Sequence, residues 1–357
     1  MCRTSYRQNI SLLKMIFRNN VWVGKMLEQY MNWYDLALEA LNYEIKNLKR
    51  LEGVEEVVVV GMGGSGIVGD MLSAIAQTYA RIPLYTYKDF YIPQNFINKS
   101  TFILAISYSG NTLETISSVQ HAIKVGIPIG IVASGGELID IAKKHHIPYV
   151  IVRQGLAPRS ALPILLIASI KILHFCGIPL IPMDIVEKSI QVLRDAEKAV
   201  AKASQLAEFL NNSRLPLIVS TTRFAPLATR FKNELNENAK MPAKVEIAPE
   251  LFHNDIVGWE RKEMHGKAIV INSDISYENL LLDFYADYLK SVGFEVFYLK
   301  LEGNVMERYL EGSLIAGLTS VKIANKLGFD PLQTRSIAMY KDFLKKYREK
   351  IVEAVLQ

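Results

Sequence analysis

Residues 101–115, TFILAISYSGNTLET, contain a short strand, a polar turn and the start of a helix. The apolar run Phe102–Ile106 predicts a buried strand, and a helical pattern of apolar residues begins at Leu113. A strand that leads directly into a helix is the repeating unit of parallel sheets covered by helices. This stretch therefore predicts an α/β fold.

Four hydroxyl side chains and one glycine lie in the turn SYSGNT, residues 107–112. The N-terminus of the following helix presents backbone N–H groups without intrahelical partners, together with the positive end of the helix dipole, and both favour anions. Ser107, Ser109 and Thr112 add O–H donors, so the turn predicts a phosphate site. No Gly-Lys-Ser/Thr follows, which excludes a P-loop. The alternative is an ordinary cap, in which Asn111 or Thr112 satisfies the helix N-terminus.

Length and charge limit the classes of function. A chain of 357 residues, half of them hydrophobic and 22% charged, predicts about two globular domains. The net charge of +5 comes from the N-terminus, because five basic residues precede Glu28, the first acidic residue. The other 36 basic residues balance the 36 acidic ones. A neutral body gives no electrostatic basis for binding nucleic acid, so no such partner is expected.

Cysteine content and hydropathy indicate where the protein works. The two cysteines, Cys2 and Cys176, exclude a disulfide framework and suit a reducing cytosol, so a cytoplasmic protein is expected. The longest apolar run, residues 161–176, is short for a membrane span and contains Lys171 and His174. We therefore expect a buried helix and no membrane partner.

The first half of the chain alternates strands with helices around a glycine-rich turn. The strand Glu56–Gly61 leads into GMGGSG, residues 61–66, and a helix that continues to Ala80. The turn matches the dinucleotide fingerprint G-x-G-x-x-G. The acidic residue that this fingerprint requires after the next strand is matched only weakly by Asp89. NAD binding is thus the less favoured alternative, and we expect no cofactor.

The second half repeats the strand–helix order but contains neither GMGGSG nor SYSGNT. Its apolar runs predict strands at 215–220, 267–272 and 295–301, and a helix over 227–240. The predicted fold is α/β with two similar domains, each a parallel sheet flanked by helices, and one ligand site per chain. The expected divisions are a disordered leader or misassigned start at residues 1–25, a first domain at 26–182 that begins with the helix Met26–Leu51, a connecting helix at 183–212, and a second domain at 213–357.

Three polar residues outside these turns have ordinary explanations when each is taken alone. Glu237, in FKNELNENAKMPA, lies on the side of its helix away from the apolar stripe, which is typical of a solvated glutamate. His253, in PELFHNDIVGWE, fits a hydrogen-bonded structural histidine. Arg159 precedes the apolar helix, where it would cap or form a salt bridge. No HxH, HExxH or CxxC spacing is present, so no metal site is predicted.

Taken together, five segments carry a resemblance to a known family. They are GMGGSG, SYSGNT, NELNENAKMPA, PELFHNDIVGWE and the C-terminal IAMYKDFL. In this order they resemble the sugar isomerase (SIS) family, and within it the archaeal bifunctional phosphoglucose/phosphomannose isomerases, over about residues 26–350. The resemblance implies two SIS-like domains. It also implies a metal-independent aldose–ketose isomerase that interconverts glucose 6-phosphate or mannose 6-phosphate with fructose 6-phosphate through a cis-enediol.

The resemblance also implies residue roles. Glu237 would move a proton between C1 and C2, and Arg159 would stabilise the enediolate and exclude water. His253 and Lys341 would assist ring opening. Thr334 would leave room for rotation about C2–C3, which admits both C2 epimers. The substrate-binding residues would be Gly63, Gly64 and Ser65 along the sugar, and Ser107, Ser109 and Thr112 at the phosphate.

The family further implies a homodimer with a shared active site, in which His253 enters the site of the partner subunit. The main alternative is a non-catalytic SIS protein that senses sugar phosphates. Such a sensor would keep the turn at residues 107–112 but would have no use for Glu237, Arg159 and His253 together. No DNA-binding helix-turn-helix is evident beside the two domains.

Overall fold

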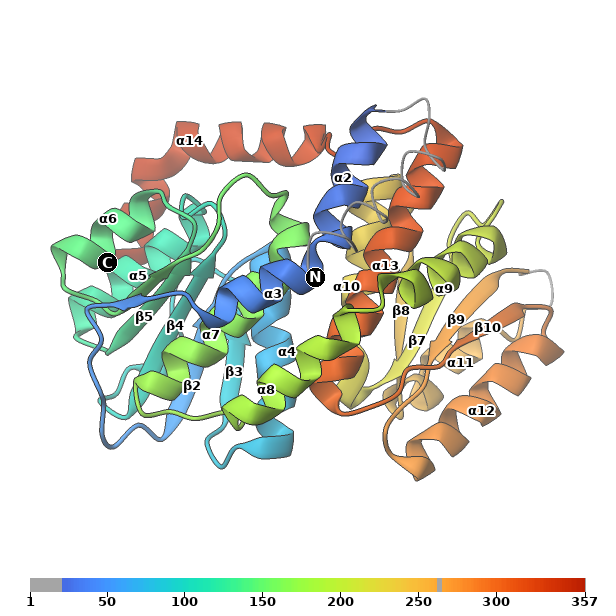
Figure 1. Ribbon diagram of the computed structural model, residues 1–357, viewed down its shortest axis with the longest axis horizontal. Helices are drawn as coiled ribbons and strands as arrows, with labels where there is room; N and C mark the ends of the chain where they lie inside the picture. Colours follow the sequence, from blue (N-terminus) through green and yellow to red (C-terminus); the bar gives the residue numbers. More distant parts are fainter. Residues whose placement is uncertain (1–20, 262–264, 357) are drawn as a thin grey trace, which may run out of the picture. The chain divides into compact units, whose positions relative to one another are not determined.

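The computed structural model describes residues 21–261 and 265–356 (Figure 1). The chain forms two compact α/β units. The described residues of the first unit lie within 34–188 and 334–356, and those of the second lie within 21–33 and 189–333. The domains expected at residues 26–182 and 213–357 follow the order of the chain. The units instead depart from this order at both ends, because the first includes residues from 334 onward and the second includes residues up to 33.

The first unit contains a six-stranded sheet in the order β1-β6-β5-β4-β2-β3. Neighbouring strands are parallel except for β1, which pairs antiparallel with β6. Every residue of β4 is buried, as its apolar sequence predicts. The strands are β1 (Ile45–Lys46), β2 (Glu56–Val60), β3 (Leu84–Tyr87), β4 (Thr101–Ser107), β5 (Ile129–Ala133) and β6 (Tyr149–Ile151).

Helices pack against this sheet, and the most apolar of them, α7, is a core helix. The segment Pro158–Phe175 is long and apolar enough to cross a membrane by length and composition alone, but 78% of it is buried inside the protein. The prediction of a buried helix is confirmed. The helices of this unit are α3 (Trp33–Leu41), α4 (Gly63–Tyr79), α5 (Leu113–Val125), α6 (Glu137–Lys144), α7 (Leu162–Phe175), α8 (Met183–Ser189) and α14 (Arg335–Leu356).

The second unit contains a four-stranded parallel sheet in the order β10-β9-β7-β8. The sequence patterns predicted three of its strands and missed β8, because Lys244 and Glu246 interrupt the apolar run. Glu246 is nevertheless buried, since it accepts hydrogen bonds from Trp259 Nε1 at 3.1 Å and Tyr285 Oη at 2.6 Å. The strands are β7 (Leu217–Thr221), β8 (Lys244–Ala248), β9 (Lys267–Ile271) and β10 (Glu295–Leu299).

The long helix α13 is the central helix of the second unit, and α2 packs beside it (Figure 1). Their close approach requires Gly317, because a Cβ there would lie 2.3 Å from the ring of Tyr30. The α-helices of this unit are α2 (Val21–Met31), α9 (Ala196–Phe209), α10 (Ala225–Glu234), α11 (Asp255–Gly258), α12 (Ser276–Ser291) and α13 (Val305–Leu327).

Two expected helices are divided in the structure. The single helix predicted over Met26–Leu51 is wrong. The helix is interrupted at Asn32, between α2 and α3, and β1 follows α3. The apolar stripe continues across the break, so periodicity alone does not reveal it. Helix α2 also includes residues 21–25 of the expected leader, and residues 1–20 lie outside the described residues.

The connecting helix expected at residues 183–212 is likewise wrong as one element. It consists of α8, a 3₁₀ turn at Ile190–Leu193, and α9. Asp195 begins the last of these by accepting a hydrogen bond from Lys198 N at 3.3 Å. An N-cap aspartate of this kind starts a new helix and does not continue an old one.

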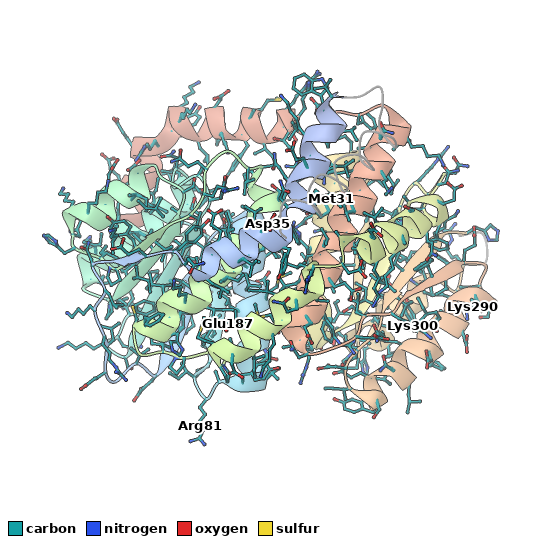
Figure 2. The ribbon with its side chains drawn as sticks, in the orientation of Figure 1. Met31, Asp35, Arg81, Glu187, Lys290 and Lys300 are labelled. Atoms are coloured by element: carbon teal, nitrogen blue, oxygen red, sulfur yellow. The ribbon has the colours of Figure 1, made fainter. Side chains whose placement is uncertain are left out.

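Charged side chains are spread over the surface of each unit. Arg81 and Glu187 are exposed in the first unit, and Lys290 and Lys300 are exposed in the second (Figure 2). Lys290 also pairs with Asp287 at 2.9 Å, and such exposed pairs contribute at most about 1 kcal/mol to stability.

Gly61 provides a test of how closely β2 and β4 approach each other. A Cβ at Gly61 would lie 2.7 Å from the backbone oxygen of Ile106, which cannot move independently of β4. We expect Gly61→Ala to lower the free energy of unfolding by about 1–3 kcal/mol, the usual cost of overpacking. Urea unfolding followed by circular dichroism measures the shift in midpoint.

Gly24→Ala, in α2, is the matched control. A Cβ there would meet nothing within 4 Å, and alanine favours a helix over glycine by up to about 1 kcal/mol. Its midpoint should stay the same or rise. Equal midpoints for the two variants would show that the contact at Gly61 relaxes without cost.

Candidate active site

The two polar turns predicted from the sequence meet at one edge of the first sheet. Strands β2 and β4 are parallel neighbours, with Val60 opposite Ala105, so the turns that follow them emerge side by side. Tyr108 N donates a hydrogen bond to Ser65 Oγ at 3.1 Å, which joins SYSGNT to GMGGSG. Residues 107–112 are called the phosphate loop below.

Side chains in the phosphate loop do not cap the helix that follows it. Ser107 Oγ donates to Thr112 Oγ1 at 3.0 Å, and Thr112 is the N-cap residue of α5 without a side-chain cap bond. Asn111 Oδ1 instead accepts from the backbone N–H of Glu137, the first residue of α6, at 3.0 Å. In the described part of the chain, neither of the expected capping residues therefore satisfies the first N–H groups of α5. This arrangement favours the anion site over the ordinary cap.

Two residues between these hydroxyls differ in their constraints. Gly110 has a φ of +67°, and a Cβ there would lie only 1.7 Å from the carbonyl oxygen of Gly135, so no other residue fits. Ser109 is exposed and accepts a hydrogen bond from Asn111 N at 3.2 Å. The loop is thus held rigidly at its glycine and open at Ser109.

Arg159 belongs to a third segment at the same edge. It lies in the 3₁₀ turn Pro158–Ala161 before α7 and is only 4% exposed. A Cβ at Gly64 would lie 3.2 Å from Pro158 O and 3.4 Å from Arg159 Cα. The glycine turn and the Arg159 turn are therefore in backbone contact, while Gly63 of the same turn is exposed.

Tyr108 links the phosphate loop to the segment that leads to Arg159. Its hydroxyl donates to Arg153 O at 3.0 Å and accepts from Leu156 N at 2.8 Å. Burial raises the pKa of Tyr108, so the hydroxyl keeps its proton at neutral pH. Tyr108 is not among the residues that the sequence patterns predicted at the site. Its only sequence signal is a large aromatic hydroxyl between two serines of a short loop.

Helix α14 brings Thr334 and Lys341 into the same unit as the phosphate loop. The helix lies along α5, and Tyr340 Oη donates to Glu114 Oε1 at 2.9 Å (Figure 1). Burial and the Glu114 carboxylate raise the pKa of Tyr340 to about 12. Lys341 is exposed, and Thr334 is half-buried just before the helix.

Glu237 belongs to the second unit and lies in a π-helical turn, Leu235–Ala239. The sequence predicted an unbroken helix to Lys240, but the turn widens after α10 and ends with Lys240 at a φ of +55°. Glu237 is half-buried, and its carbonyl accepts from Lys240 Nζ at 2.5 Å. π-helical turns occur frequently at functional sites.

His253 also belongs to the second unit, at the end of a 3₁₀ turn, Glu250–His253. The histidine is exposed. Its neighbours hold the loop in place, because Lys244 Nζ donates to Asp255 Oδ1 at 2.7 Å and Asn254 Nδ2 donates to Glu250 Oε1 at 2.7 Å. The loop therefore presents His253 outward from an anchored base.

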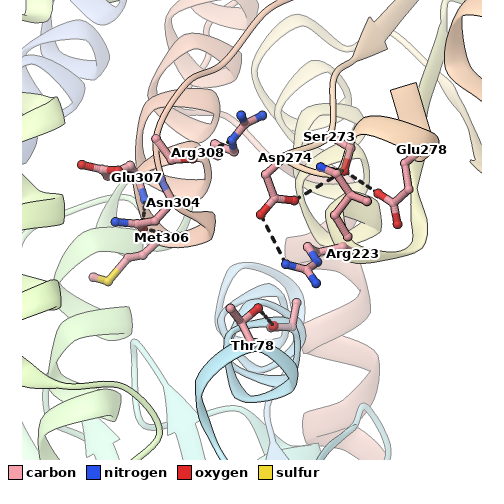
Figure 3. Close-up of polar contacts among 12 residues, drawn as sticks. Thr78, Arg223, Ser273, Asp274, Glu278, Asn304, Met306, Glu307 and Arg308 are labelled. Atoms are coloured by element: carbon pink, nitrogen blue, oxygen red, sulfur yellow. Dashed lines mark hydrogen bonds and ion pairs between the residues drawn. The ribbon is translucent and has the colours of Figure 1, made fainter. Parts of the chain in front are cut away.

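At the matching edge of the second sheet, the loops bind their own side chains (Figure 3). Arg223 pairs with Asp274 at 3.3 Å, and Ser273 donates to Glu278. Asn304 caps α13 in a reciprocal capping box, unlike Thr112 at α5. At α13, unlike at α5, a side chain thus already satisfies the first backbone N–H groups. Within residues 21–261 and 265–356, no three His, Cys, Asp or Glu side chains are grouped to hold a metal ion.

Comparison with known proteins agrees with this architecture. Residues 199–344 match the model of the bacterial phospho-glucose isomerase C-terminal SIS domain. The bifunctional phosphoglucose/phosphomannose isomerase of Aeropyrum pernix is 33% identical over 325 residues, covering 88% of this chain and 97% of that protein. The chain belongs to the bifunctional phosphoglucose/phosphomannose isomerase family.

Other similarities show how widely this SIS architecture is used. The D-glucosamine-6-phosphate 4-epimerase of Sulfolobus acidocaldarius is 29% identical, covering 87% of this chain and 95% of that protein. The crystal structure of glucosamine-6-phosphate deaminase from Thermotoga maritima has a TM-score of 0.65 at 14% identity, covering 87% of this chain and 95% of that one. The latter similarity concerns the fold alone.

Proposed function

We propose that this family member is an aldose–ketose isomerase that interconverts glucose 6-phosphate or mannose 6-phosphate with fructose 6-phosphate. The phosphate loop is the observation that carries the proposal. Ser107 and Thr112 bond to each other and leave the N-terminus of α5 to a ligand. A phosphate group is the anion that such a helix N-terminus suits best. We also place the protein in the cytoplasm, because it has only two cysteines.

The proposed chemistry is proton transfer through a cis-enediol without a metal. Abstraction of a proton next to a carbonyl needs a base at the carbon and positive charge at the developing oxyanion. Glu237 supplies the carboxylate and Arg159 the guanidinium. One carboxylate returns the proton to the adjacent carbon, so a single glutamate is enough. His253 and Lys341 assist ring opening.

The remaining proposed contacts set substrate selection. Ser109 joins Ser107 and Thr112 at the phosphate, and Gly63, Gly64 and Ser65 lie along the sugar. Thr334 leaves space for rotation about C2–C3, so both C2 epimers are substrates. These roles follow from the family resemblance, and the backbone contact of Gly64 with the Arg159 turn supports them.

A direct assay tests the proposed reaction. Purified protein treated with EDTA should convert glucose 6-phosphate and mannose 6-phosphate to fructose 6-phosphate, detected by a coupled assay, and Glu237→Gln should abolish both conversions. Binding without turnover would instead identify a sugar-phosphate sensor. Conversion only of glucosamine 6-phosphate at C4 would assign the activity of the epimerase relative. Loss of activity in EDTA that Zn²⁺ or Mn²⁺ restores would contradict the metal-free mechanism.

The phosphate loop has its own test. Ser107→Ala combined with Thr112→Ala should raise KM for the phosphorylated sugars at least ~10-fold, because each hydrogen bond to a charged group contributes about 1.5–3 kcal/mol. Ser213→Ala, at an unrelated loop, is a suitable control, since it also removes a serine hydroxyl. An unchanged KM in the double variant would show that the loop binds no phosphate.

We further propose that two copies of the chain form a homodimer in which His253 enters the active site of the partner subunit. An apolar stripe on α12 supports this assembly, because Tyr277, Leu280 and Phe284 are 61%, 69% and 61% exposed. Phe284 contacts Phe252, the neighbour of His253, at 5.7 Å between ring centroids. Exposed apolar patches of this kind mark protein–protein interfaces. The stripe therefore continues into the loop that carries the histidine.

Mixing two inactive variants tests the shared site. Glu237→Gln and His253→Ala, allowed to exchange subunits, should recover about a quarter of wild-type activity, because half of randomly paired dimers are mixed and each has one intact site. Native mass spectrometry measures the exchange. If mixed dimers form and no activity returns, His253 acts within its own chain or outside the site.

A further inference from the structure

Five polar side chains are buried directly beside the π-helical turn that carries Glu237. Arg230 and Glu234 come from α10, Asn238 from the turn itself, Tyr30 from α2 and Ser320 from α13, and each is at most 1% exposed. Burial of so many polar groups is costly unless they are bonded to one another. They form what is called the turn network below.

Hydrogen bonds connect all five members of the turn network. Glu234 Oε2 accepts from Tyr30 Oη at 2.6 Å and from Asn238 Nδ2 at 2.7 Å. The other oxygen, Oε1, pairs with Arg230. Asn238 Nδ2 also lies 2.8 Å from Ser320 Oγ, which in turn donates to Gly317 O at 2.7 Å. The network thus joins three segments that are distant in the sequence: α2 through Tyr30, the stretch from α10 to the turn, and α13 through Ser320.

The network fixes the inward face of the π-helical turn. Asn238 follows Glu237 directly, and its side chain is fixed inward by Glu234 and Ser320. The hydrogen bond between the side chains of residues 234 and 238 spans the junction between α10 and the π-helical turn. Because the inward position belongs to Asn238, Glu237 lies on a different flank of the turn, where it is half-buried. The direction of Glu237 therefore depends on the bonds of its neighbour.

We propose that Tyr30, Glu234 and Asn238 are positioning residues that hold Glu237 in the geometry for proton transfer. This inference rests on the proposed function for its catalytic consequence. The inference gives α2 a role in the reaction, because α2 carries Tyr30. The hydroxyl of Tyr30 belongs to the network, and its ring packs on Gly317 of α13. Removal of the Tyr30 hydroxyl leaves the ring in place. It takes away one of the bonds that orient the Glu234 carboxylate, so Glu234 holds Asn238 less firmly.

Tyr30→Phe is the informative variant, and Tyr309→Phe is its matched control. Tyr309 is equally buried in the same unit, and its hydroxyl donates to Arg223 O, outside the turn network. We expect Tyr30→Phe to lower kcat for isomerisation roughly 10- to 100-fold, since a misplaced catalytic group costs about this much. KM should change less than about twofold, because phosphate contacts dominate ground-state binding. Ser320→Ala, a milder change, should give a smaller fall in kcat.

Hydrogen exchange read by mass spectrometry separates this inference from the proposed function. Peptides that cover residues 235–243 should exchange faster in Tyr30→Phe than in the wild-type protein and in Tyr309→Phe. If their exchange is unchanged, or if kcat falls equally in Tyr309→Phe, the positioning role is overturned. If hydrogen exchange of these peptides accelerates in Tyr30→Phe but the wild-type protein isomerises no sugar phosphate, the proposed function is wrong. The network would still be shown to stabilise the turn.

Discussion

The parallel pairing of β2 with β4 is the constraint on which the phosphate site depends. Because these strands run side by side in the same direction, the turns after Val60 and Ser107 emerge at one edge. The hydrogen bond from Tyr108 N to Ser65 Oγ then fixes one turn against the other. Gly61 permits this approach, and Gly64 permits that of the turn before α7, since each faces backbone atoms where a side chain would clash or crowd.

Helix α5 in the first unit and helix α13 in the second begin in different ways. In the first unit, Thr112 bonds to Ser107 and leaves the start of α5 uncapped by its side chain. In the second unit, Asn304 and Glu307 close the start of α13 in a capping box, and Asp274 takes up Arg223. The start of α5 therefore favours an anion, whereas side chains already satisfy backbone N–H groups at the start of α13. The fold is repeated, but the binding chemistry is not.

Buried polar networks account for the shape of the chain around the proposed catalytic residues. Tyr108 ties the phosphate loop to the segment before Arg159. Glu234 ties α2 to the turn before Lys240, and Asn238 ties α13 to the same turn. A buried hydrogen-bonded group fixes direction more strictly than apolar packing does, because an unmet donor or acceptor is costly. In each network, contacts between distant segments thus set the orientation of a single side chain.

The sequence alone determined the α/β class, the two polar turns and the burial of α7, because these depend on local periodicity and on turn residues. It also selected Glu237, His253 and Arg159, through the family resemblance and not through their local patterns. Only the tertiary structure decided the strand β1, the strand β8 and the π-helical turn. Each of these is stabilised by partners far away in the chain: β1 by β6, Glu246 by Tyr285, and Asn238 by Ser320. Local propensity does not depend on such distant partners, so no local sequence pattern predicts these elements.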